Sequence, residues 1–138
     1  MKIGEDEAVT YRPLLQQEEE IGRLIVDAAF TVHKKLGPGL LEKVYEPCFC
    51  HELAKRRLGF ERQVVVPILY DGLQFEEGFR IDVLVEKLVI CELKAVTEIH
   101  PVHEAQLLSY MRLTQKRLGY LINFHTVKIK DGIYRRIL

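Results

Sequence analysis

The hydrophobic residues in the first half of the chain recur at helical spacing. Ile21, Leu24, Ile25, Ala28, Val32 and Leu36 lie three or four positions apart, with charged residues between them. This spacing predicts an amphipathic helix from Glu18 to Leu36. Gly37-Pro38-Gly39 follows, and a glycine and a proline after the last periodic residue indicate where the helix ends.

A second helix is predicted over residues 40–58, with Leu41, Val44, Tyr45 and Leu53 on one side. Pro47 lies inside it and has no backbone N–H to donate to the preceding turn. We therefore expect a kink near residues 43–46 or a new helix start at Pro47.

The second half of the chain reads mainly as strands. Residues 60–70 are rich in Val and Ile, and Pro67 among them indicates an edge strand or a bulge. Asp71-Gly72 predicts a tight turn into residues 73–75. Two apolar segments, 81–85 and 88–93, predict a buried hairpin. A helix over 102–118, a strand over 120–124 and a terminal hairpin (126–130 and 133–138, turning at Asp131-Gly132) complete an α/β sandwich around one mixed sheet.

Three ionisable residues interrupt the buried hairpin: Asp82, Glu92 and Lys94. Glu92 and Lys94 are two positions apart, so their side chains share one face of a strand. A two-residue turn at Glu86-Lys87 would pair Asp82 with Cys91 and place Asp82 on the opposite face. An odd-length turn or a bulge would set Asp82 opposite Glu92, and we predict this arrangement.

Length and composition limit the class of protein. The 138 residues fit one domain, which we assign to residues 18–138 behind a loosely held arm at residues 1–17. The 20 basic and 20 acidic residues balance, so any polyanion must bind a local patch. Cys48, Cys50 and Cys91 form no even framework and are expected to be buried thiols in a reducing compartment. No signal-like or membrane-spanning apolar run is present, so a cytoplasmic protein without a membrane partner is expected.

Asp82, Glu92 and Lys94 are the residue types that a metal-dependent hydrolytic site needs. Two converging carboxylates hold a hard divalent cation through oxygen, and water fills its remaining positions. A neighbouring lysine can orient or deprotonate a water, or neutralise charge growing on a phosphate. The alternative is a structural Glu92–Lys94 pair with Asp82 at an exposed strand end, and spacing alone favours this alternative.

Further motifs carry a resemblance to a known family. Residues 39–45 read G-x-x-E-x-x-Y, residues 90–96 read ICELKAV, residues 105–110 read AQLLSY and residues 119–124 read GYLINF. In this order they resemble the GxxExxY family of the PD-(D/E)xK nuclease superfamily, over residues 18–138. The proline of the superfamily's name is absent, since Ile81 precedes Asp82. The resemblance implies a restriction-endonuclease-like single domain with a mixed central sheet flanked by helices.

The resemblance also implies residue roles. Asp82 and Glu92 would be metal ligands for Mg²⁺ or Mn²⁺, with the Leu93 carbonyl as a third ligand, and Lys94 would be the catalytic lysine. Glu42 would offer a further carboxylate to the metal or to its waters. Glu42 also begins a helix, where a surface glutamate is favoured by the helix dipole, and this is the alternative reading.

Four other residues are candidates to support the site. Gln106 and Tyr110 share one helix face, and in related nucleases such a glutamine positions a carboxylate, the lysine or the substrate phosphate. We expect Gln106 to be functional and leave Tyr110 open. Tyr45 either orients Glu42 or packs in the core, and packing is favoured. His103 either lines the same cleft or is a helix-start histidine, and zinc at His100 and His103 is disfavoured because no further ligand pair exists.

The resulting hypothesis is a Mg²⁺- or Mn²⁺-dependent phosphodiester hydrolase acting on nucleic acid, with DNA favoured over RNA. Its candidate basic patches are Lys34-Lys35, Lys55-Arg56-Arg57, Lys116-Arg117 and Arg135-Arg136, which a homodimer would combine. Helix-end capping is the favoured role of Lys55-Arg56-Arg57. The alternatives are a non-catalytic metal- or partner-binding module that retains the fold, or a hydrolase of smaller phosphate compounds. The quartet Glu42, Asp82, Glu92 and Lys94 favours an enzyme.

Overall fold

The computed structural model describes residues 12–138. Residues 1–11, which make up most of the expected arm, lie outside this range, and Gln16 and Gln17 already belong to the first helix. The elements in chain order are α2 (Gln16–Leu36), α3 (Glu42–Lys55), β1 (Phe60–Tyr70), β2 (Leu73–Val85), β3 (Val89–Lys94), α4 (Pro101–Thr114), β4 (Leu118–Asn123), the short 3-10 helix η1 (Ile129–Gly132) and β5 (Ile133–Ile137).

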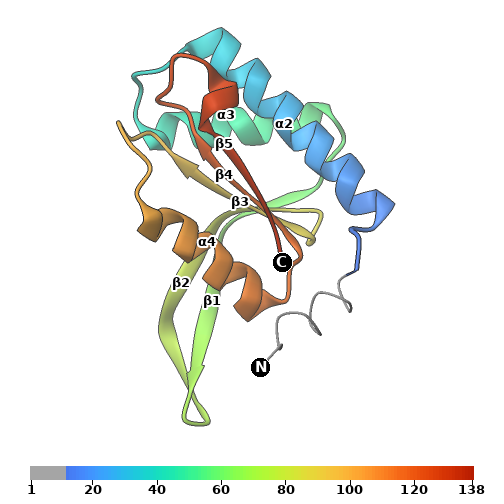
Figure 1. The fold of residues 1–138 in the computed structure, drawn as a ribbon, viewed down its shortest axis with the longest axis vertical. Helices are drawn as coiled ribbons and strands as arrows, with labels where there is room; N and C mark the ends of the chain where they lie inside the picture. The colour runs from blue at the N-terminus through green and yellow to red at the C-terminus, as the bar shows by residue number, and fades with distance from the viewer. Residues whose placement is uncertain (1–11) are drawn as a thin grey trace, which may run out of the picture.

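One five-stranded mixed sheet organises the fold, in the order β1-β2-β3-β4-β5. β3 and β4 are parallel, and the other neighbouring pairs are antiparallel. α2 and α3 cover one face of the sheet and α4 covers the other (Figure 1). This is the α/β architecture that the sequence predicted, and α4 supplies the crossover that a parallel β3–β4 pair requires.

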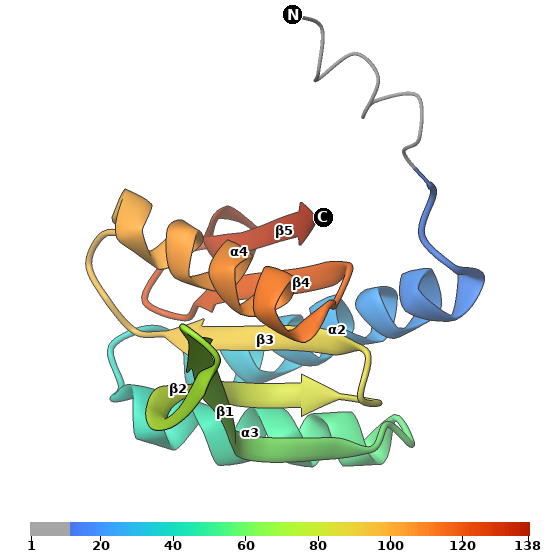
Figure 2. The ribbon, with the colours of Figure 1, turned by 90° about the horizontal axis from the view of Figure 1, so that it is seen from below.

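Pro67 has the effect predicted for it. β1 is an edge strand, and its register with β2 shifts between Val66 and Ile68. Asp71 and Gly72 form the predicted tight turn, both with positive φ (55° and 75°), as a type I′ turn requires. β2 is a single long strand, and the distal end of the β1–β2 hairpin projects away from the helices (Figures 1 and 2).

The expected restart of the second helix at Pro47 is wrong, because α3 runs unbroken from Glu42 to Lys55. Pro47 cannot donate to the carbonyl of Lys43, four residues earlier. Both residues are exposed, so solvent can hydrate that carbonyl and the helix continues.

The end of the third helix and the terminal hairpin also differ from the prediction. α4 ends at Thr114, because Gln115 adopts a left-handed φ of 57° and the Lys116 N–H returns to the Met111 carbonyl at 2.9 Å. Asp131-Gly132 lies in the helical turn η1 rather than in a hairpin turn. Gly132 packs so closely against the end of β4 that a side chain there would lie 2.2 Å from the Asn123 carbonyl oxygen. β5 therefore pairs with β4, and residues 126–130 form no strand.

Tyr45 connects the second helix to the loop before it. Its ring is fully buried and stacks on Phe124, with 4.6 Å between centroids. Its hydroxyl donates to the Gly37 carbonyl at 2.6 Å and accepts from the Leu40 N–H at 3.2 Å. Tyr45 therefore packs in the core and also fixes the loop that leads into Glu42.

We expect Tyr45→Phe to lower the free energy of unfolding by about 1 kcal/mol, because it keeps the stacked ring but leaves the Gly37 carbonyl and the Leu40 N–H without their partner. Urea denaturation measures this change. Tyr134→Phe is the matched control: Tyr134 is half-buried with Arg136 over its ring, a contact that phenylalanine retains. Equal effects of the two substitutions would show that the Tyr45 hydroxyl does not hold the loop.

Candidate active site

The turn between β2 and β3 has three residues, as the parity argument required. Val85 pairs with Val89, so Glu86, Lys87 and Leu88 form the connection. Glu86 and Lys87 both have positive φ (54° and 57°), and the Leu88 N–H closes the turn onto the Val85 carbonyl at 2.9 Å. The predicted odd-length turn is confirmed, and its register sets Asp82 opposite Glu92.

Asp82 and Glu92 lie where β2 separates from β3. The last ladder pair is Val83 with Cys91, after which β2 continues in contact with β1 alone. We call this point the fork. Here each carboxylate accepts a hydrogen bond from a backbone N–H of the other strand. Glu92 accepts from the Asp82 N–H at 2.9 Å, and Asp82 accepts from the Leu93 N–H at 2.8 Å. These two bonds hold the carboxylates together on the same side of the sheet.

Burial disfavours a negative charge on both carboxylates of this pair at once. Glu92 is 7% exposed, and burial, followed by the Asp82 charge, raises the pKa of Glu92 to about 8. Burial also raises the pKa of Asp82, against the opposing effect of the Leu93 N–H. A nearby cation would remove this penalty, so the electrostatics of the fork favour binding a positive ion.

Lys94 and Glu42 also lie at the fork, Lys94 on β3 and Glu42 on α3. Lys94 is half-buried at the end of β3, and its charge lowers the pKa of both Glu92 and Asp82, although burial dominates both values. Glu42 is the first residue of α3. Burial and then the Asp82 charge raise the pKa of Glu42, which places its exposed carboxylate near the same cluster.

The donor set suits a hydrated hard cation better than a closed cage. Within residues 12–138, no three His, Cys, Asp or Glu side chains are grouped closely enough to hold a metal ion. Asp82 and Glu92 each use one oxygen for a backbone amide, which leaves a second oxygen on each. One or two carboxylates with several waters is the usual protein ligand set of Mg²⁺, and the residues fit that pattern.

Tyr110 and Gln106 differ in their relation to the fork. Tyr110 is half-buried and stacks on Phe79, with 3.9 Å between centroids. Burial raises its pKa, and the charges of Glu92 and Asp82 raise it further, so Tyr110 borders the carboxylates. Gln106 lies one turn earlier on the same helix and is exposed, with no hydrogen bond to the described part of the chain.

His103 lies at the start of α4. Its Nδ1 accepts from the His100 N–H at 3.1 Å, which caps the first turn of the helix. Burial lowers the pKa of His103, and the Lys94 charge lowers it further. His103 is therefore a helix-start histidine that also faces the lysine side of the fork.

Sequence reasoning missed three residues beside the fork: Glu46, Arg62 and Gln63. Glu46 is 7% exposed and lies one helical turn after Glu42. It accepts from Arg62 Nε and from Gln63 Nε2, each at 2.9 Å. The E-x-x-x-E spacing of Glu42 and Glu46 was a signal for a shared helix face. A hollow of about 540 Å³ is lined by these residues together with Leu41, Glu42 and Lys43.

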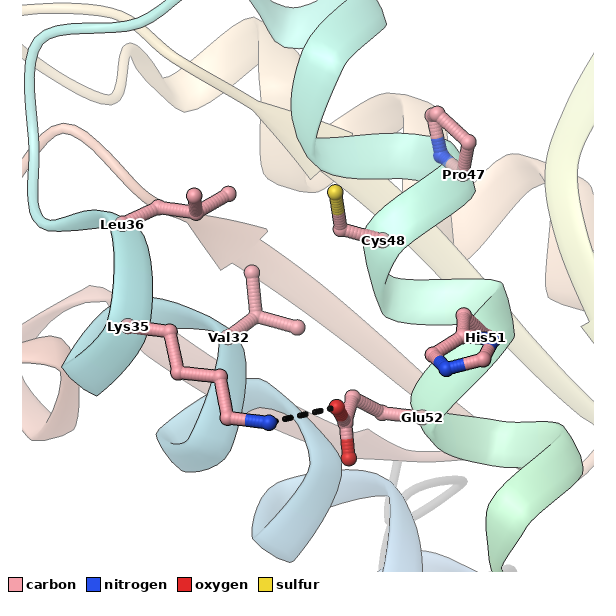
Figure 3. Close-up of a pocket in the computed structure, with 7 residues that line it drawn as sticks. All are labelled: Val32, Lys35, Leu36, Pro47, Cys48, His51 and Glu52. Atoms are coloured by element: carbon pink, nitrogen blue, oxygen red, sulfur yellow. Dashed lines mark hydrogen bonds and ion pairs between the residues drawn. The ribbon is translucent and has the colours of Figure 1, made fainter.

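A second hollow, of about 320 Å³, lies between α2 and α3 and is mostly apolar (Figure 3). Its carboxylate, Glu52, binds Arg56, Lys55 and Lys35. The hydrogen bond from Arg56 is the largest influence that lowers the pKa of Glu52 to about 2. Arg56 also donates to the Glu52 carbonyl at 2.9 Å, which agrees with the helix-end role predicted for this basic run. This hollow carries none of the residues of the fork.

The three cysteines follow their predicted burial in part. Cys50 and Cys91 are buried thiols, and Cys48 is half-buried in the apolar hollow. Burial raises the pKa of Cys50 to about 12, which makes it unreactive. None of the helices within residues 12–138 combines the length and the apolar character needed to cross a membrane.

Comparison with known proteins agrees with the fold. The family model described as the PD-(D/E)XK nuclease superfamily matches residues 19–137, which include Glu42, Asp82, Glu92 and Lys94. Searches of curated proteins and of solved structures found no match. The five-stranded mixed sheet with three flanking helices agrees with that family model. The chain therefore belongs to the PD-(D/E)XK nuclease superfamily.

Proposed function

We propose that this protein is a Mg²⁺- or Mn²⁺-dependent phosphodiester hydrolase that acts on nucleic acid, with DNA favoured over RNA. The observation that carries the proposal is the fork itself. Asp82 and Glu92 are held side by side by backbone amides, with Lys94 next to them. A buried carboxylate pair with raised pKa values and an adjacent lysine has a clear use in metal-assisted hydrolysis.

Each residue of the fork has a role in this proposal. Asp82 and Glu92 would hold the cation through their remaining oxygens, and Glu42 would accept hydrogen bonds from its waters. When bound, the cation would supply an acidified water and neutralise charge on the phosphate. Lys94 orients the attacking water or stabilises the phosphate oxygens. Gln106 and Tyr110 approach the phosphate from α4, with His103 beside Lys94, and the Leu93 carbonyl is a further candidate ligand.

We also propose that the chain belongs to the GxxExxY family. Its motif behaves as one structural unit. Gly39 has a φ of 104°, a conformation that favours glycine, and the Tyr45 hydroxyl binds the same loop. Together they set where α3 begins, and so where Glu42 lies. The cytosolic location and the homodimer stay predictions.

The hollow beside Glu42 offers a path for the substrate strand. Its volume of about 540 Å³ is lined by Lys43, Arg62 and Gln63 as well as by the two glutamates of α3. A nucleic-acid backbone passing the fork would meet the Lys43 ammonium next to the reacting phosphate. We therefore place one arm of the substrate in this hollow.

Mn²⁺ titration by calorimetry tests the site, beside cleavage assays on single-stranded, duplex and branched DNA and on RNA. Asp82→Asn keeps the size of the side chain but removes its charge. Because ligand loss exceeds the 10- to 100-fold cost typical of outer-shell changes, we expect Mn²⁺ affinity and cleavage to fall by more than about 100-fold. Asp131→Asn, an exposed change in η1, is the control.

Two results would contradict the proposal in different ways. Unchanged Mn²⁺ affinity in Asp82→Asn would reject the site. Mn²⁺ binding that depends on Asp82, without cleavage of any of these substrates, would indicate a non-catalytic module that retains the fold and the metal.

The pKa of Glu92 predicts how stability depends on pH when no metal is added. The folded protein binds a proton on Glu92 up to a pH of about 8, whereas the unfolded chain releases it near the ordinary value of 4.5. The folded state therefore holds more protons in this window, and stability must fall as pH rises through it. We expect a loss on the order of 5 kcal/mol, measured by urea denaturation in EDTA.

Glu92→Gln should flatten most of that slope, because it removes the titrating group. Glu52 does not interfere, since its pKa of about 2 means that its contribution is complete above the ordinary value of 4.5. Mn²⁺ binding should show the opposite trend and tighten with pH, with release of a proton. A wild-type profile as flat as that of Glu92→Gln would contradict the raised pKa.

Lys43 tests the substrate path. In a Lys94→Ala background, which prevents cleavage, we expect Lys43→Glu to weaken oligonucleotide binding. We also expect it to make the negative slope of log affinity against log salt shallower by about one. Fluorescence anisotropy across a salt series measures both quantities. Lys130→Glu makes the same charge change at an exposed residue outside the hollow and should have a smaller effect. Equal effects would place the strand elsewhere.

A further inference from the structure

Gln63 breaks the regular alternation of β1. Neighbouring residues of a strand normally point to opposite faces of the sheet. Arg62 and Gln63 instead both donate to the same carboxylate, Glu46, at 2.9 Å each. The cause is the backbone of Gln63, whose φ of 53° is left-handed, a conformation that costs energy for a residue other than glycine. This strained residue therefore turns its amide toward α3 and the fork.

The position of Gln63 in the sheet brings it to Asp82. Arg62 pairs with Val83 and Val64 pairs with Ile81, so Gln63 occupies the place between them, directly across from Asp82. The Gln63 side chain also lies close enough to the Asp82 carboxylate to act on it as a hydrogen-bond donor. The strand register and this contact both place the amide beside the carboxylate.

We propose that Gln63 is a positioning residue that holds the Asp82 carboxylate in the orientation needed for metal binding, and that Glu46 and Arg62 in turn hold Gln63. The inference rests on the proposed function, because the orientation of Asp82 matters only if Asp82 binds the cation.

The hydrogen-bonding capacity of the amide explains why this residue is a glutamine. Its nitrogen carries two hydrogens, of which one lies on Glu46, while the other is available to Asp82. Glu46 pairs with Arg62 and accepts from the nitrogen of the Gln63 amide, so it fixes which end of the amide faces the carboxylates. Leu93 then holds one oxygen of Asp82 from the β3 side, and Gln63 holds the carboxylate from the β1 side.

Calorimetric Mn²⁺ titration of Gln63→Gly tests the inference. Glycine relieves the left-handed backbone and removes the amide, so a purely structural role for Gln63 would leave metal affinity unchanged. We expect Mn²⁺ affinity to fall about 10-fold or more, as is typical when an outer-shell partner of a ligand is lost. We also expect kcat to fall by a larger factor than the KM for the oligonucleotide rises, because Gln63 lines the hollow beside Glu42 but acts on Asp82.

Gln115 provides a matched control within the same chain. It is also an exposed glutamine with a left-handed φ, 57°, but it caps the far end of α4. Gln115→Gly should leave Mn²⁺ affinity at the wild-type value. Gln63→Met keeps the volume and the backbone strain but not the amide, so it should show the same loss of Mn²⁺ affinity. It replaces Gln63→Gly if circular dichroism shows that the glycine variant folds poorly.

The outcomes separate this inference from the function on which it rests. If Asp82→Asn loses Mn²⁺ affinity while folded Gln63→Gly or Gln63→Met binds like wild type, the role of Gln63 is overturned and the site stands. If wild type and Asp82→Asn do not differ in Mn²⁺ binding, both the proposed function and the role of Gln63 are rejected.

Discussion

The site depends on two hydrogen bonds between the diverging strands: Glu92 accepts from the Asp82 N–H, and Asp82 accepts from the Leu93 N–H. Glu92 is buried and Asp82 is half-buried, so burial disfavours both charges, and the two carboxylates repel each other when both are ionised. Each is held in place because it replaces a ladder bond that the diverging strands can no longer make. The same two bonds therefore complete the hydrogen bonding of the fork and keep both acids ready for a cation.

The fork exists because β2 has two different partners. Near the turn it pairs with β3, and beyond Val83 it pairs with β1 alone. The long β1–β2 contact is irregular: it contains the register shift at Pro67, and a side chain at Gly78 would lie 1.9 Å from the Val66 carbonyl oxygen. β1 is thus free to depart from regular strand geometry, and Gln63 uses that freedom beside Asp82.

The parts of the fold set by periodicity could be predicted from the sequence, and the parts set by single backbone angles could not. Strand parity predicted that an odd-length turn or a bulge would bring Asp82 opposite Glu92, because a shift of one residue reverses every side chain. Gln63 lies in a β-branched run with no signal for a left-handed φ. Asp131-Gly132 suits a hairpin turn or a helical turn equally well by composition, and only its packing against β4 decides between them.

The neutral charge of the chain is consistent with the proposed substrate once the location of its charges is considered. Several arginines are occupied in ion pairs within the domain, among them Arg56, Arg62 and Arg135. The fork and its surroundings are acidic, so without a cation they would repel a phosphate backbone. A bound divalent cation reverses the local sign at the point where the phosphate must lie. Substrate binding at this site would then depend on the metal rather than on a broad basic surface, and the two binding events should reinforce each other.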